Sequence, residues 1–180
     1  MRLKLAGLAL VAAVALTPSA TAASQKLWLT KTNQRLTTGD AIETSFVIEG
    51  GSACRLRYDG TVGSNGASTD KLSFPTRTEH SCASGWGIRA GTLTWAITSG
   101  GQLTIKSAPK ILIGFPGYCV YEVAKLVGNF SPGQPLHVNG GATGKLDKAA
   151  TLGEGCPETK AIGWEVEVDK ERGELGTELA

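Results

Sequence analysis

Apolar and polar side chains alternate along several stretches of the chain, with the two-residue period of a β-strand. In residues 92–98 a leucine, a tryptophan and an isoleucine share one face, and threonines occupy most of the other. Residues 99–101 read Ser-Gly-Gly, and the alternation resumes at Leu103 and Ile105. Alternation on both sides of a short glycine turn predicts a β-hairpin.

The same period recurs elsewhere in the chain. Three apolar side chains share a face in residues 41–48, and a tryptophan and two valines alternate with acidic residues in 163–169. Residues 110–115 form a more continuously apolar run. No part of the chain after residue 23 sustains the 3.6-residue period of an amphipathic helix. We therefore predict an all-β protein.

Two of the predicted strands begin with a cysteine. Residues 54–63 and 119–128 each carry apolar side chains two and four positions after the cysteine, and each ends in Val-Gly. A glycine-rich stretch, a second cysteine and a tryptophan-containing strand follow in both cases. We interpret this pattern as a β-sandwich of the immunoglobulin-like or Greek-key type, with two similar halves at about residues 41–107 and 110–170. Three of the ten positions are identical, so chance similarity is the alternative to duplication.

The chain has four cysteines, Cys54, Cys82, Cys119 and Cys156. They can pair as 54–82 with 119–156, as 54–119 with 82–156, or as 54–156 with 82–119. The first pairing is favoured, because it gives each half of the chain its own local crosslink. In the chain-entropy model each bridge of this kind stabilises the fold by about 3.5–4 kcal/mol. A zinc site is disfavoured, because no two cysteines stand in the short Cys-x-x-Cys spacing.

The N-terminus predicts export. Arg2 and Lys4 precede the apolar residues 5–16, and residues 20–22 read Ala-Thr-Ala, the small-x-small pattern of a cleavage site. An apolar run of this length is too short to cross about 30 Å of hydrocarbon as a helix. We therefore predict a signal peptide over residues 1–23 and a single secreted domain over residues 24–180, with no membrane span in the mature chain.

Loss of the signal peptide would leave a neutral domain. The whole chain has 18 basic and 16 acidic residues, and the signal peptide takes two of the basic ones, so that 16 of each remain. The charges are dispersed along the chain, which provides no basic patch for nucleic acid.

Several of these motifs occur together in one group of proteins. They are the leader, the Cys54 strand, the Cys82 loop, the hairpin with Trp-Ala-Ile-Thr at residues 95–98, Cys-Val-Tyr at 119–121, Gly-Cys-Pro at 155–157 and the strand of residues 164–168. In this combination the chain resembles uncharacterised secreted two-disulfide β-rich proteins of high-GC Gram-positive bacteria. The resemblance covers most of the chain after the leader. It implies export, two disulfides and a β-rich fold, and it implies no activity.

His80-Ser81-Cys82 is the strongest candidate for enzymatic chemistry. It is similar to the His-Gly-Cys centre of peptidoglycan transpeptidases, in which a base activates a thiolate, but a serine replaces the glycine. The even number of cysteines also gives Cys82 a disulfide partner. The chain has no Gly-x-Ser-x-Gly elbow and no metal-binding motif, and we predict no metal or cofactor.

Glu165 and Glu167 have the spacing of a glycosidase pair, because strand geometry places alternate residues about 6–7 Å apart. The opposite face of their strand is apolar, which favours instead the solvent side of an amphipathic strand. His80 and His137, the only histidines, lie in polar and turn-rich sequence and are predicted to be surface residues.

Trp86 is the candidate ligand contact. It stands between two glycines beside a predicted disulfide, where its ring would either stack on a sugar or a peptide or fold back to plug the sandwich. The first functional hypothesis is a non-enzymatic extracellular or envelope-associated binding or structural module, with a glycan, a cell-wall component or a protein as partner. The alternative is a small secreted cysteine-dependent hydrolase or transpeptidase that uses Cys82 and His80.

Overall fold

The computed structural model describes residues 26–31, 34–49, 53–89, 91–106, 110–113, 118–167 and 175–179. Every regular element in these ranges is a β-strand, so the all-β prediction is confirmed. Within the same ranges there is no helix of the length and apolarity needed to cross a membrane. The predicted signal peptide, residues 1–23, lies outside the described residues.

The strands form two hydrogen-bonded sheets, and all neighbouring strands are antiparallel. The small sheet has the order β14-β1-β2 and consists of β1 (Leu27–Lys31), β2 (Gln34–Arg35) and β14 (Leu175–Leu179). The main sheet has the order β11-β8-β7-β5-β4-β3-β13-β12-β10-β9-β6. Its strands, in chain order, are β3 (Ala41–Glu49), β4 (Ala53–Ser64), β5 (Thr69–Cys82), β6 (Trp86–Arg89), β7 (Leu93–Thr98), β8 (Gln102–Lys106), β9 (Lys110–Ile113), β10 (Cys119–Glu122), β11 (Lys125–Asn129), β12 (Val138–Leu146) and β13 (Thr159–Glu167).

The hairpin predicted from the alternation is confirmed. β7 and β8 pair from Thr98 opposite Gln102 to Thr94 opposite Lys106. Gly101 in the turn has a φ of 79°, and a Cβ there would lie 2.6 Å from a backbone oxygen, so the position requires glycine. The strand predictions at residues 41–48 and 163–169 correspond to β3 and β13. β13 begins four residues earlier than predicted, and residues 168 and 169 lie outside the described ranges.

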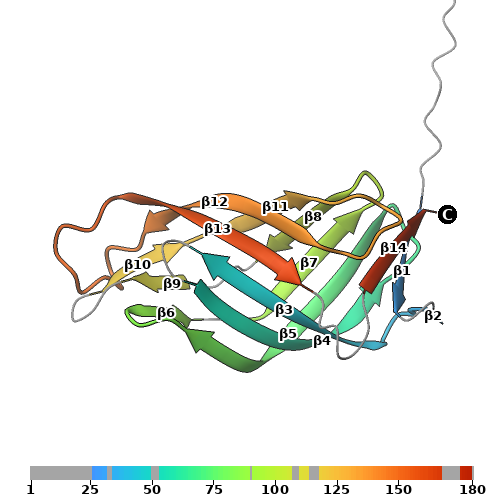
Figure 1. The fold of residues 1–180 in the computed structure, drawn as a ribbon, viewed down its shortest axis with the longest axis horizontal. Helices are drawn as coiled ribbons and strands as arrows, with labels where there is room; N and C mark the ends of the chain where they lie inside the picture. The colour runs from blue at the N-terminus through green and yellow to red at the C-terminus, as the bar shows by residue number, and fades with distance from the viewer. Residues whose placement is uncertain are drawn as a thin grey trace, which may run out of the picture.

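The eleven strands of the main sheet form one continuous sheet, and the β-sandwich of the immunoglobulin-like or Greek-key type is not confirmed. The sheet curls until β11, its first strand, lies beside β12, the eighth strand in the order. At the other edge β6 lies against β4 and β5. Figure 1 shows an elongated molecule, with β6, β9 and β10 at one end and the small sheet at the other.

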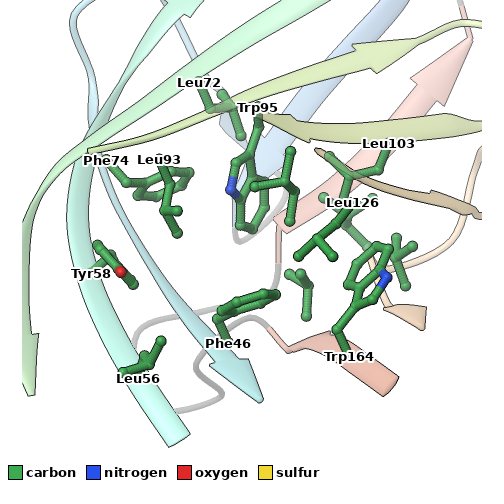
Figure 2. Close-up of a cluster of buried hydrophobic side chains, with 14 of the residues drawn as sticks. Phe46, Leu56, Tyr58, Leu72, Phe74, Leu93, Trp95, Leu103, Leu126 and Trp164 are labelled. Carbon is green, nitrogen blue, oxygen red and sulfur yellow. The ribbon is translucent and has the colours of Figure 1, made fainter. Parts of the chain in front are cut away.

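Aromatic rings fill the interior that β3, β4, β5, β7, β8, β11, β12 and β13 surround, and we call this part the aromatic body. The ring centroids of Trp95 and Phe74 are 4.6 Å apart, and those of Trp164 and Phe46 are 6.3 Å apart. Figure 2 shows these rings with Tyr58 and leucines from five strands. Each labelled side chain is at most 2% exposed, so the core is almost completely desolvated.

Two glycines make room for Trp164 between β11 and β12. A Cβ on Gly128 or on Gly140 would lie 2.9 Å from atoms of the Trp164 ring. Real Cβ atoms do not approach so closely, so the indole occupies space that any other residue at these positions would take. The side chain of Trp164 thus fills the seam at which the curled sheet meets itself.

The second part of the molecule is the disulfide arm, which consists of β6, β9, β10 and the loop of residues 147–158. Cys119 at the start of β10 is bonded to Cys156 in the loop. Cys54 on β4 is bonded to Cys82, four residues before β6. The prediction of two disulfides is confirmed, and the pairing is the one favoured from the sequence.

The two bridges differ in their setting. Cys54 and Cys82 are direct partners on adjacent strands, with Cα atoms 4.1 Å apart. Cys156, in contrast, lies in a loop outside any strand. The duplication of residues 41–107 and 110–170 stays a prediction.

Candidate functional site

His80 and Cys82 both lie near the end of β5. The sulfur of Cys82 is bonded to that of Cys54, which leaves no thiol at this position to act as a nucleophile. His80 is exposed, as predicted, and lies opposite Leu56 in the sheet. This geometry gives the cysteine-dependent enzyme hypothesis no support.

His137 and Glu165 form a pair on the outer surface. The Nε2 atom of His137 lies 2.5 Å from Oε1 of Glu165, and the two side chains are 58% and 31% exposed. Glu165 therefore has an imidazole beside it, and the side chain of Glu167 lies outside the described residues. On the opposite face of β13, Trp164 and Val166 are buried, as the amphipathic interpretation predicted. Exposed pairs of this kind contribute little to stability.

A shallow hollow of about 460 Å³ is lined by residues of β12 and β13. Gly141 lies opposite Gly163, and Thr143 lies opposite Ala161. Because these residues are small, they leave a depression in the surface. Ala142 and Ile162 complete the lining. Since all the lining residues are small or apolar, the hollow offers few groups that would orient a ligand.

The loop of residues 147–158 begins at an ion-paired aspartate. Oδ1 of Asp147 accepts hydrogen bonds from the backbone N–H groups of Ala149 (3.1 Å) and Ala150 (3.2 Å). Its Oδ2 accepts a hydrogen bond of 2.8 Å from Nζ of Lys110, which also pairs with Glu122. The hydrogen bond from Lys110 lowers the pKa of Asp147, and its two carboxylate partners, Asp147 first, raise the pKa of Lys110. Both groups are therefore charged at neutral pH, and the pair ties the first turn of the loop to β9.

The loop then follows the edge of β10. The backbone N–H of Val120 donates a hydrogen bond of 3.0 Å to Oγ1 of Thr151. The N–H of Leu152 donates a hydrogen bond of 3.1 Å to the carbonyl oxygen of Tyr118. The disulfide to Cys156 fixes the far end. The loop is thus attached to β10 and Tyr118 along its length, and the hydroxyl of Tyr121 also donates a hydrogen bond of 3.1 Å to the carbonyl oxygen of Pro157.

Leu152 is the one large apolar side chain that is exposed within the described ranges, at 71%. Tyr118, which accepts its backbone hydrogen bond, is half-buried. Trp86 is also half-buried, and it lies two strands from Cys119, because both residues are paired with Ile113 of the intervening β9. All three residues lie in or directly beside the disulfide arm, and we call Trp86, Tyr118 and Leu152 together the apolar tip.

The structure places Trp86 partly in the core and partly at the surface. Its ring packs against the buried cluster. A tight turn sets the position of Trp86. In this turn the backbone N–H of Trp86 donates a hydrogen bond of 3.1 Å to the carbonyl oxygen of Ala83, and Gly85 has a φ of 82°. The ring therefore serves as a plug over part of its surface, and its contact with a ligand stays a prediction.

Sequence reasoning missed Leu152 and Tyr118. The signal for Leu152 is an isolated leucine in a glycine-rich segment that ends at a cysteine. Tyr118 precedes a cysteine directly, which says nothing of its exposure.

No group of three or more histidine, cysteine, aspartate or glutamate side chains in the described part of the chain is placed to hold a metal ion. Comparison with known proteins finds no matching family model, no similar curated protein and no similar solved structure.

Proposed function

We propose that this protein is a non-enzymatic extracellular binding module that contacts a component of the cell wall through its apolar tip. The observation that carries the proposal is the 71% exposure of Leu152 in a loop held by a disulfide and backbone hydrogen bonds. Disulfides persist in oxidising compartments, which supports a location outside the cytoplasm.

A fixed apolar side chain is suited to binding for two reasons. Removing apolar surface from water contributes about 25 cal/mol per Å². Because the backbone of Leu152 is already ordered by its bond to Tyr118, little conformational entropy is lost when a partner covers it.

The two aromatic members of the tip favour a wall polymer as the partner. Tyr118 and Trp86 combine an apolar ring with a polar atom, and such rings pack on the faces of sugars and on peptide groups. A peptide-crosslinked glycan presents both. The charged groups at the base of the loop, Lys110, Glu122 and Asp147, are paired with one another.

Co-sedimentation with purified Gram-positive cell walls tests the proposal. We expect the parent protein to sediment with the walls and Leu152→Ser or Trp86→Ala to weaken retention about tenfold, the usual effect of removing a central contact. Lys148→Ser is the matched control, because Lys148 lies on the same loop and its side chain is 73% exposed. Its retention should equal that of the parent. Intact mass and circular dichroism verify that each variant keeps both disulfides and its sheet.

Three results would contradict the proposal, the first two in the sedimentation with walls and the third in a control with cellulose. One is a parent protein that stays in the supernatant. Another is a folded Leu152→Ser variant that is retained as well as the parent. Equal binding of the parent to cellulose would show general glycan adsorption and exclude a wall-specific role.

A further inference from the structure

The turn between β4 and β5 attaches β1 of the small sheet to the aromatic body, whereas β14 is hydrogen-bonded to residues 133–136. Oδ1 of Asn65 in this turn accepts a hydrogen bond of 2.8 Å from the N–H of Leu29 on β1. The amide nitrogen of Asn65 donates to the carbonyl oxygens of Leu29 and Leu36. The N–H of Leu27 donates to the carbonyl oxygen of Ala67 at 3.2 Å. One turn thus makes three polar contacts with β1 and a fourth with Leu36, which follows β2.

Trp28 contacts both an arginine and the turn. The guanidinium of Arg35 lies 4.3 Å from the centroid of the Trp28 ring, within the range of a cation–π contact. On the turn, a Cβ at Gly66 would lie 2.8 Å from the ring. β1 therefore rests directly on the backbone of the turn.

Asp70 follows this turn as the second residue of β5 and is completely buried. Its Oδ1 accepts a hydrogen bond of 3.1 Å from the N–H of Ala67, whose carbonyl oxygen binds Leu27 on β1. Its Oδ2 is buried and has no hydrogen-bond partner within the described part of the chain. A carboxyl group in such a place is tolerated when protonated and is costly when ionised.

The charged side chains around Asp70 do not offset this cost. Burial is the largest influence on its pKa, and the backbone N–H groups of Ala67 and Gly66 act in the opposite direction. None of the titratable groups on the surrounding elements contributes to the pKa of Asp70. These groups are Lys26, Lys31, Arg35, Asp40, Lys71 and Glu178.

We propose that Asp70 is a pH-sensitive latch for the small sheet. The sheet stays docked while this carboxyl is protonated and opens more often once it is ionised. Opening would uncover Leu27 and Leu29, which are fully buried in the closed state.

The direction follows from proton linkage. Burial raises the pKa of Asp70 from 3.8 to about 6 in the closed state. In an open state, water would solvate the carboxylate and the pKa would return toward its ordinary value. The closed state binds the proton more tightly, so rising pH favours opening, chiefly between these two pKa values. With these values the ratio of open to closed molecules rises about tenfold between pH 5 and pH 7.5.

Hydrogen–deuterium exchange of the intact protein, with labelling times scaled for the intrinsic exchange rate at each pH, tests the latch. We expect the protection of β1 and β14 to be about tenfold lower at pH 7.5 than at pH 5. β7 and β8 should keep their protection and serve as the internal reference. Asp70→Asn should give β1 the same protection at both pH values. His137→Gln, which alters the exposed pair with Glu165, should leave the pH dependence in place.

Equal protection of β1 in the parent at the two pH values would overturn the proposal. A pH dependence that persists undiminished in folded Asp70→Asn would overturn it as well. The comparison of the parent protein at the two pH values needs no substitution. It therefore tests the proposal even if Asp70→Asn fails to fold.

Discussion

The aromatic body and the disulfide arm are parts of one sheet, yet different forces hold them together. In the body Trp95, Phe46, Phe74 and Tyr58 are at most 1% exposed. Among the described side chains of the arm, Tyr121 is the one of comparable size that is buried so completely. The body is stabilised chiefly by removal of apolar surface from water.

Among the side chains that the structure describes, the arm has fewer buried ones than the body, and it is crosslinked instead. Trp86 is half-buried and Leu152 is exposed. One disulfide lies within the arm, and the other joins β4 to β5 just before β6 begins. Small units that cannot bury enough apolar surface use covalent bridges to restrict the unfolded chain. The comparison teaches that crosslinks allow the arm to keep apolar side chains at its surface, where a partner can reach them.

Truncating one tryptophan in each part is the strongest test of this contrast. Trp95→Ala should destabilise the protein by about 3–5 kcal/mol, because it leaves a large cavity in the core. Trp86→Ala should cost less than half as much, since its side chain is half-buried. Urea unfolding followed by far-ultraviolet circular dichroism measures both losses. Equal losses would show that the arm depends on its core as much as the body does.

Removal of the bridge within the arm should have the next largest effect. The bridge joins residues separated by 37 positions. In the chain-entropy model such a closed loop contributes about 3.9 kcal/mol, which Cys119→Ala/Cys156→Ala would remove. Because the bridge lies in the arm, hydrogen exchange should accelerate in β9 and β10 while β7 and β8 remain protected. Uniform acceleration in both parts would mean that the arm and the body unfold as one unit.

Alternation predicted the local elements of the body well. A side chain at every second position reports which face of a strand is buried, and so residues 92–106 identified β7 and β8. The same pattern does not tell which strand lies beside which. A sheet curled on itself and two facing sheets both bury one face of each strand. The alternation of apolar and polar residues is therefore compatible with a β-sandwich as well as with a curled sheet.

The elements that the sequence analysis missed depend on distant contacts. β1 pairs with β14 across almost the whole chain, from Leu27 opposite Leu179 to Lys31 opposite Leu175. β6 is only four residues long and gains its place by pairing with β9. The exposure of Leu152 likewise results from how the loop is attached to β10. Such contacts leave no period in the local sequence. The cysteine pairing could be predicted, because pairing each cysteine with its neighbour in the sequence gives each half of the chain its own disulfide.

Two adjacent glycines on β12 allow the smallest and most specific test of the body. A Cβ on Gly140 would lie 2.9 Å from the Trp164 ring, whereas a Cβ on Gly141 would meet nothing within 4 Å. Gly140→Ala should therefore cost about 1–3 kcal/mol through overpacking. Gly141→Ala should change the free energy of unfolding by less than about 0.5 kcal/mol, as exposed substitutions usually do.

The cause can be separated from a general intolerance of alanine in this strand. If the clash with Trp164 is responsible, Gly140→Ala should cost less in a Trp164→Leu background, because the smaller side chain leaves room for the added methyl group. Urea unfolding of the four proteins in this cycle measures the coupling. A zero coupling energy would show that the indole does not occupy the space above Gly140, and the seam between β11 and β12 would then need another explanation for its closure.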